Sequence, residues 1–127
     1  MEILASRMLL RPADYPLSLA FYRDALGLAI AREYPGGTVF YAGQSLIEVA
    51  GHGEPHTTSA ALWLQVRDVY ATEEELAGRG VPITRAARQE PWGLHELQIT
   101  DPDGVTLIFV QIPPKHPLRR DSRADTA

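Results

Sequence analysis

The hydrophobic positions of the chain follow the same succession twice: one strand pattern, one helix pattern and then three further strand patterns. In the first half, apolar residues recur at helical spacing from Leu17 to Leu28. Asp14 and Pro16 favour a helix start just before Leu17, and Gly27 favours the helix end. Turn-forming residues separate the strand patterns. The expected strands of this half cover residues 3–11, 28–34, 38–42 and 45–50.

The second half repeats the succession after a linker rich in turn-forming residues at 51–58. Asp68 can cap a helix that continues through Leu76, and Gly78 and Gly80 favour its end. The expected strands of this half cover residues 61–66, 82–89, 94–100 and 105–112.

These patterns predict an α+β fold made of two tandem βαβββ modules. The modules cover about residues 3–51 and 59–112, and each is too small to bury a comfortable core alone, so we expect a single domain over residues 1–112. One helix per module covers one face of an open mixed sheet and leaves the other face free. Residues 113–127 read as a polar C-terminal tail.

Strand alternation predicts which side chains lie on the face that the helix does not cover. In the strand at 45–50, Ile47 and Val49 should meet the helix, which places Glu48 on the opposite face. In the first strand, Arg7 should share that face, so Arg7 and Glu48 are expected to be close. The same reasoning puts Trp63 on the uncovered face of the second module.

Composition and charge narrow the function classes. The chain has 127 residues, 45% hydrophobic content and no cysteine, which excludes disulfide scaffolds, thiol nucleophiles and cysteine-ligated metals. A formal net charge of -4 argues against nucleic-acid and anionic-membrane partners. No apolar run is long enough to span a bilayer, and the start carries no leader pattern. We therefore expect a cytoplasmic protein.

The segment FYRDALGL at residues 21–28, together with PWG at 91–93 and DPDG at 101–104, resembles the vicinal oxygen chelate superfamily. This superfamily contains glyoxalases, extradiol dioxygenases, fosfomycin-modifying enzymes and bleomycin-resistance proteins. The resemblance covers about residues 3–112. It implies open, U-shaped sheets that enclose a pocket, usually completed across a homodimer.

The resemblance also implies four positions for metal ligands, one on the first and one on the last strand of each module. They fall on Arg7, Glu48, Ala61 (or Leu62 with a shift of one residue) and Ile108. Only Glu48 can bind a metal, whereas a catalytic divalent ion needs about three protein donors. We therefore expect neither a metal nor another cofactor at the usual site.

Five further interpretations stay open at this stage. Glu48 is either a pocket carboxylate that contacts ligand or acts as a base, or a structural ion pair with Arg7. Trp63 and Trp92 either stack on a planar ligand or fill core or dimer-interface volume. His95 is an acid–base group, a ligand contact or a structural residue, and the alternation does not show which way it faces. The aromatic residues of the middle hairpin of the first module either add aromatic wall to the pocket or are ordinary strand residues: Tyr34, Phe40 and Tyr41.

Two functions compete. The first is a metal-independent binding protein resembling the bleomycin-resistance branch, without catalytic residues, that sequesters an aromatic or hydrophobic antibiotic or metabolite in homodimer clefts. Its expected ligand contacts are Arg7, Tyr41, Glu48, Trp63, Trp92, His95 and Ile108. The second is a lyase or oxidoreductase resembling glyoxalases or dioxygenases, with a relocated metal held by Glu48 with His95 or another donor.

Overall fold

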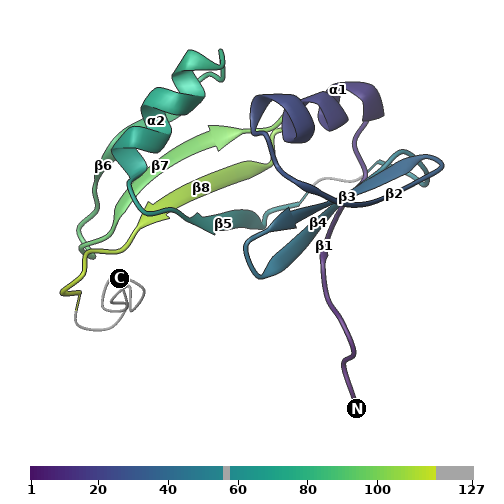
Figure 1. Cartoon of the computed structure of the whole chain (residues 1–127), viewed down its shortest axis with the longest axis horizontal. Coiled ribbons are helices and arrows are strands. Elements are labelled where there is room, and N and C mark those ends of the chain that lie inside the picture. The colour runs from purple at the N-terminus through teal and green to yellow at the C-terminus, as the bar shows by residue number, and fades with distance from the viewer. Residues whose placement is uncertain (56–57, 117–127) are drawn as a thin grey trace. The chain divides into compact units, whose positions relative to one another are not determined.

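The computed structural model describes residues 1–55 and 58–116 and has two four-stranded mixed sheets (Figure 1). It confirms the predicted α+β class and the two βαβββ-like modules. The chain divides into two compact units. The first unit is Met1–Ser59 with Asp101–Val105, and the second unit is Ala60–Thr100 with the described residues from Thr106 onward.

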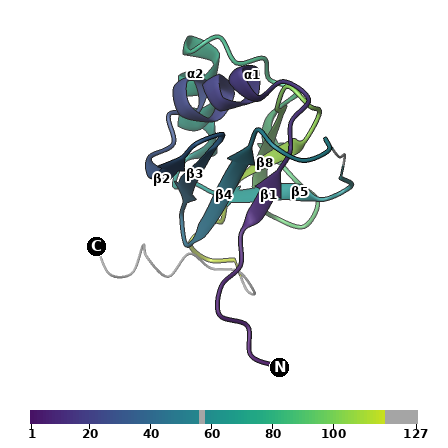
Figure 2. The same ribbon diagram turned by 90° about the vertical axis from the view of Figure 1, so that its right-hand side faces the viewer.

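The first unit has its strands in the order β1-β4-β3-β2, with β1 parallel to β4 and the other neighbours antiparallel. Figure 2 shows these strands side by side, with α1 along one side of the sheet. Asp14 caps α1 by accepting the Leu17 N–H at 3.1 Å, as the sequence predicts. The elements are β1 (Met8–Leu10), α1 (Tyr15–Ala20), a π-helical turn η1 (Phe21–Ala25), β2 (Ile30–Tyr34), β3 (Gly37–Ala42) and β4 (Ser45–Ala50).

Two expectations for this unit are wrong in extent. The first strand was expected over residues 3–11, but only Met8–Leu10 pairs, with Ile47–Val49 of β4. A β-compatible sequence needs a partner strand, and Ile3 and Leu4 instead stay exposed. The single expected helix becomes α1 followed by a wider turn, in which the Leu26 N–H donates to the Phe21 carbonyl at 2.9 Å.

The second unit has its strands in the order β5-β8-β7-β6, with β5 parallel to β8. Asp68 accepts the N–H groups of Tyr70 and Ala71, which confirms it as the helix cap. The last turn of the helix ends before Gly80, whose positive φ of 78° suits glycine. The elements are β5 (Ala61–Gln65), α2 (Val69–Gly78), β6 (Arg85–Gln89), β7 (His95–Thr100) and β8 (Thr106–Gln111).

Each unit buries the helix-facing side of its own sheet. In the first unit the fully buried side chains include Tyr22, Phe40 and Ile47, and in the second they include Leu97 and Ile99. In β1, β4 and β5 the buried apolar side chains, which include Leu10, Ile47, Val49 and Leu62, lie on the face that alternation predicted. Among the described residues, no helix is long and apolar enough to cross a membrane.

The turn between β7 and β8 is anchored in the first unit. The buried Tyr22 hydroxyl donates to Asp101 Oδ2 at 2.8 Å. Asp101 Oδ1 accepts the backbone N–H groups of Asp103 and Val105. Burial, and then the Asp101 carboxylate, raise the pKa of Tyr22 far above its ordinary value. The DPDG turn is thus fixed to the η1 helix by a neutral phenol and a satisfied carboxylate.

Candidate functional site

The face of the first sheet opposite α1, here called the first open face, carries a chain of three polar side chains. Arg7 Nη1 donates to Glu48 Oε1 at 2.9 Å, so the two residues form the expected ion pair. The Tyr34 hydroxyl donates to the other carboxylate oxygen, Oε2. Each oxygen of Glu48 therefore already accepts a hydrogen bond within the first unit.

Tyr34 reaches Glu48 because a glycine lies beside it. Gly37 is opposite Tyr34 in the β2–β3 register, and a Cβ at Gly37 would overlap the Tyr34 ring. The Arg32 guanidinium lies over the same ring, 5.7 Å from its centroid, and His52 meets the ring edge at 6.2 Å between centroids. The sequence interpretation missed the Tyr34 contact, for which the only signal is an aromatic residue paired with a glycine across a hairpin.

These contacts fix the protonation of both groups near neutral pH. The Tyr34 hydrogen bond lowers the pKa of Glu48, and the Arg7 hydrogen bond and charge act in the same direction, although burial opposes them. Burial, and then the hydrogen bond to Glu48, raise the pKa of Tyr34 to about 12. The carboxylate stays charged and the phenol stays neutral, which is the arrangement of a structural anchor rather than of a free base.

The face of the second sheet opposite α2, here called the second open face, has a different chemistry. Trp63 pairs with Ile108 across β5 and β8, and Ile108 pairs with Gln98 across β8 and β7. Trp63 is 45% exposed, so its indole is accessible on this face. The strand register places Trp63 and Ile108 in one row of side chains, and the exposure of Trp63 agrees with the face that alternation predicted for it.

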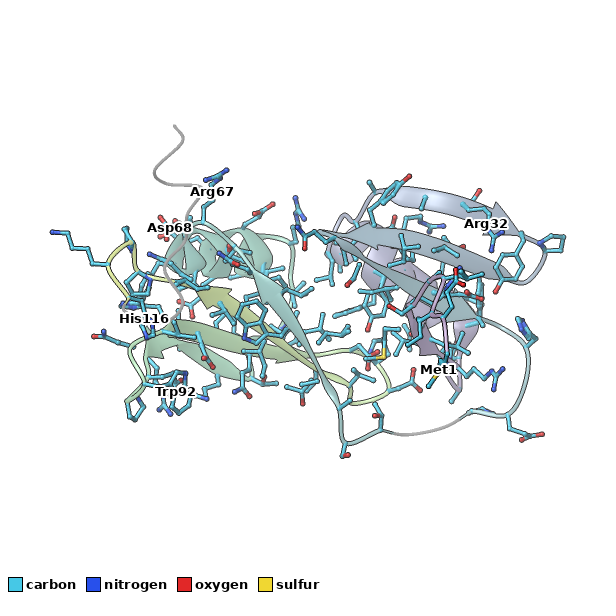
Figure 3. The ribbon with its side chains drawn as sticks, turned by 90° about the horizontal axis from the view of Figure 1, so that it is seen from below. Met1, Arg32, Arg67, Asp68, Trp92 and His116 are labelled. Carbon is cyan, nitrogen blue, oxygen red and sulfur yellow. The ribbon has the colours of Figure 1, made fainter. Side chains whose placement is uncertain are left out.

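A carboxylate that the sequence interpretation did not single out lies on the same face. Glu96 is only 7% exposed and accepts the indole N–H of Trp92 on Oε2 at 2.8 Å. Trp92 is 56% exposed as a residue, and its backbone carbonyl oxygen lies 3.0 Å from Nε2 of His116 (Figure 3). The alternation of β7 contained the signal for Glu96, but the sequence did not show which side of this strand meets the helix.

His95 lies on the other side of β7. It shares the alternation of the buried Leu97 and Ile99, and its Nδ1 is 2.7 Å from the hydroxyl of Tyr70 in α2. The first open face also carries Tyr41, which is 54% exposed. The structure therefore places Arg7, Tyr41, Glu48, Trp63, Trp92 and Ile108 at the open faces, and His95 under α2.

The donor set does not fit a divalent metal at the positions that the resemblance implies. Arg7 is a permanent cation, Ala61, Leu62 and Ile108 have no donor atoms, and Glu48 is engaged by Arg7 and Tyr34. Throughout residues 1–55 and 58–116, no group of three or more histidine, aspartate or glutamate side chains is arranged to hold a metal ion.

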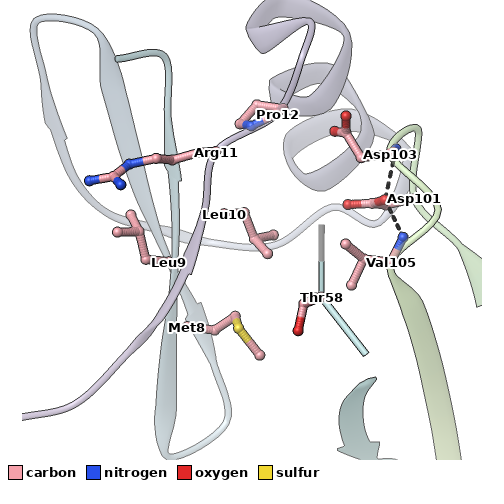
Figure 4. A pocket seen from close by; sticks show the side chains of 9 residues that line it. All are labelled: Met8, Leu9, Leu10, Arg11, Pro12, Thr58, Asp101, Asp103 and Val105. Carbon is pink, nitrogen blue, oxygen red and sulfur yellow. Dashed lines mark hydrogen bonds between the residues drawn. The ribbon is translucent and has the colours of Figure 1, made fainter. Parts of the chain in front are cut away.

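A pocket of about 150 Å³ in the first unit lies between β1, Thr58 and the Asp101–Val105 turn (Figure 4). Its carboxylates are already engaged: Asp101 accepts from the turn and from Tyr22, and Asp103 Oδ1 accepts the Ala13 N–H at 3.0 Å. These bonds tie the turn to Ala13, between β1 and α1, and to Tyr22 of η1, so we interpret the pocket as a packing gap of the first unit.

Comparison with solved structures supports the fold. A glyoxalase/bleomycin resistance protein/dioxygenase from Nocardioides aligns with a TM-score of 0.72 at 16% identity, over 95% of this chain and 91% of its own. A glyoxalase-related enzyme from Fulvimarina pelagi gives a TM-score of 0.70 at 22% identity, over 89% and 90%. A superfamily member from Sphaerobacter thermophilus DSM 20745 gives 0.71 at 21%, over 88% and 99%.

At these identities the solved structures show the fold alone. A search of curated proteins finds no match. The family model described as "Glyoxalase/Bleomycin resistance protein/Dioxygenase superfamily" matches residues 5–109, which is most of the chain and includes both modules. The chain therefore belongs to the glyoxalase/bleomycin resistance protein/dioxygenase superfamily.

Proposed function

We propose that the protein is a metal-independent small-molecule binding protein that sequesters an aromatic or hydrophobic compound. The observation that carries the proposal is the Arg7–Glu48–Tyr34 chain. At a position where metal-dependent relatives place a ligand, the only possible donor is held by a guanidinium and a phenol. A metal would have to displace both contacts and approach a permanent cation, which electrostatics disfavours.

Exposed aromatic side chains on the open faces support an aromatic ligand. Trp63 on the second open face and Tyr41 on the first are each about half exposed, and Trp92 is more exposed still. Large aromatic groups kept in water retain an apolar surface that a planar ligand can cover, and such stacking adds to the gain from burial. The hydrogen bond from Trp92 to Glu96 fixes one indole before any ligand arrives.

The proposal includes a homodimer whose two copies complete the clefts. Each described sheet has a helix on one face only, so the opposite face has no secondary-structure layer from its own unit. Sedimentation velocity of the purified protein should give the mass of two 14.0 kDa chains. A monomer at micromolar concentration would remove the dimer from the proposal.

The function is tested by fluorescence and metal content together. Titration with a panel of planar aromatic antibiotics that do not chelate metals should quench tryptophan emission to saturation, and a chelator should leave the curve unchanged. Trp63→Ala should weaken binding about tenfold or more, because a stacked indole contributes more than about 1.4 kcal/mol. Leu17→Ala, which truncates an exposed apolar side chain of α1, is the matched control and should leave binding unchanged.

The competing function is enzymatic turnover with a relocated metal. Elemental analysis that finds one Mn, Fe, Ni or Zn per chain, lost in Glu48→Ala, would overturn the binding-only proposal. Quenching that is abolished by the chelator and restored by one of these metals would do the same.

A further inference from the structure

Glu96 is a recessed carboxylate with an incomplete set of contacts. One of its oxygens, Oε2, accepts the Trp92 indole N–H at 2.8 Å, and no other hydrogen bond to its side chain occurs among the described residues. Oε1 accepts no hydrogen bond from a described residue, and the side chain keeps 7% of its surface exposed. Glu96 is thus mostly buried, with one carboxylate oxygen that lacks a donor within the described residues.

The nearby cations of the second unit are held by another acid. Arg88 lies opposite Glu96 in the β6–β7 register, yet its Nε is 3.5 Å from Glu90 Oε1. Arg85 also forms an ion pair with Glu90. Within residues 58–116 no lysine, arginine or histidine forms an ion pair with Glu96. A recessed carboxylate without a cation is costly, and one hydrogen bond from a neutral indole offsets only part of that cost.

We infer that Glu96, oriented by Trp92, is the subsite for a cationic nitrogen carried by the planar aromatic ligand, whose rings extend across β8 toward Trp63. This inference rests on the proposed binding function and names its ligand class. The formal net charge of -4 favours the approach of a cation to the protein as a whole. A charge-assisted hydrogen bond to the free oxygen would supply the counter-charge that the described chain does not.

The strand register sets the size of that ligand. Trp63 is opposite Ile108, whereas Glu96 is opposite Val110, so the two side chains stand two strands apart and two residues apart along the strands. With strands ~4.8 Å apart and ~3.4 Å per residue, their Cα atoms are separated by roughly 12 Å. Indole and carboxylate side chains shorten this span, which a fused three-ring aromatic with one amino substituent can bridge.

The first open face would not take the same cation. Its carboxylate, Glu48, already binds Arg7, and Arg32 lies nearby over the Tyr34 ring. Two guanidiniums beside one carboxylate leave that cluster with a net positive charge, which repels a cationic nitrogen. The two open faces therefore differ in the sign of the charge that they accept, and the cation belongs to the second.

The test uses three probes with the same ring system and different charge: 9-aminoacridine, which is a cation at pH 7.5, acridine, which is neutral, and acridine-9-carboxylate, which is an anion. Calorimetric titration of the full chain should give affinities in that order. Glu96→Gln keeps an acceptor for the Trp92 N–H but removes the charge. This variant should lower the affinity for 9-aminoacridine at least ~10-fold and change the affinity for acridine less than ~2-fold. Glu74→Gln, which removes an equal charge from the exposed side of α2, is the matched control and should change neither.

Each outcome decides the inference. A wild-type protein that binds acridine as tightly as 9-aminoacridine overturns the cationic subsite but leaves the proposed binding function standing. The same holds if Glu96→Gln weakens all three probes equally, which is the signature of a structural role. If Glu74→Gln weakens 9-aminoacridine as much as Glu96→Gln does, only the net charge matters and the subsite is overturned. Absence of binding by all three probes contradicts both the subsite and the aromatic-binding function.

Discussion

The two units carry one carboxylate each on the open face of a central strand, and the surroundings of these carboxylates differ. Glu48 of β4 has both oxygens occupied, one by a guanidinium and one by a phenol. Glu96 of β7 has one oxygen bonded to an indole, and the other accepts no hydrogen bond from a described residue. The same βαβββ plan thus builds a self-contained ion cluster in one unit and an incomplete one in the other. A ligand can supply the hydrogen bond that the incomplete cluster lacks.

The helices of the two units show a parallel difference. Tyr22 of η1 is fully buried and donates to the buried Asp101, whereas Tyr70 of α2 is 43% exposed and meets His95 near the surface. When a hydrogen bond to a buried carboxylate is broken, no water molecule can take the place of the lost donor. When a surface hydrogen bond is broken, water replaces it. The first unit therefore depends on particular polar contacts more than the second does.

The largest expected effect is that of Tyr22→Phe. Removing the hydroxyl leaves Asp101 Oδ2 buried without its donor, which should lower the free energy of unfolding by about 2–3 kcal/mol. Tyr70→Phe removes a hydroxyl of the same kind at the surface and should cost less than about 1 kcal/mol. Urea unfolding of the two variants measures both values. Equal losses of unfolding free energy would show that the two tyrosine hydroxyls stabilise their units to the same extent.

Gly37→Ala comes next in size. The new methyl group would overlap the Tyr34 ring and push the phenol away from Glu48, at a cost of about 1–2 kcal/mol in unfolding free energy. Gly78→Ala, at a helical position with open space around it, should instead be neutral or stabilising. In a Tyr34→Ala background the Gly37 substitution should cost little, and a full cost there would mean that the ring is not the cause.

Much of the fold could be predicted from the sequence because its signals are local. The N-cap residues Asp14 and Asp68 mark the helix starts, and the strand at 45–50 has the predicted bounds. The length of β1 could not be predicted, since strand ends are set by the partner strand and not by the strand itself. The π-helical turn at Phe21–Ala25 is likewise a feature of packing that no spacing in the sequence announces.

The candidate site was predictable to a lesser degree. Alternation placed Arg7 and Glu48 on one face, since Ile47 and Val49 leave no other choice. The hydrogen bond of Tyr34 to Glu48 was missed because it runs diagonally over Gly37 to a strand that is not adjacent to β2. Glu96 was missed because the expected strand began at Leu94, which lies on the same side as Glu96 and made that side mixed, whereas the observed strand begins at His95.

A smaller loss of unfolding free energy is expected for Arg7→Ala, which tests the ion pair on the first open face. Loss of the guanidinium leaves Glu48 with the Tyr34 hydrogen bond alone, and we expect a cost of about 1 kcal/mol because the pair is only partly shielded from water. Arg79→Ala breaks an exposed ion pair with Glu75 on α2 and should cost less, about 0.3–0.5 kcal/mol. An unchanged urea midpoint for Arg7→Ala would remove the ion pair from the account of the first open face.

The smallest effect concerns the acid side of the stability curve. The pKa of Glu48 is lowered in the folded protein. At pH values above the ordinary pKa of 4.5, the ionised carboxylate therefore stabilises the fold. That contribution is lost as the pH falls below 4.5 and through the lowered folded-state pKa. Glu48→Gln should therefore be less stable than the wild type at pH 7, by about 1 kcal/mol or less, with the difference shrinking as the pH falls below about 4.

Glu74→Gln controls for the lost charge, because the Glu74 carboxylate lies on the exposed side of α2. A Glu48→Gln difference that stays constant from pH 7 to pH 3 would mean that the charge of Glu48 contributes nothing to the chain formed with Arg7 and Tyr34.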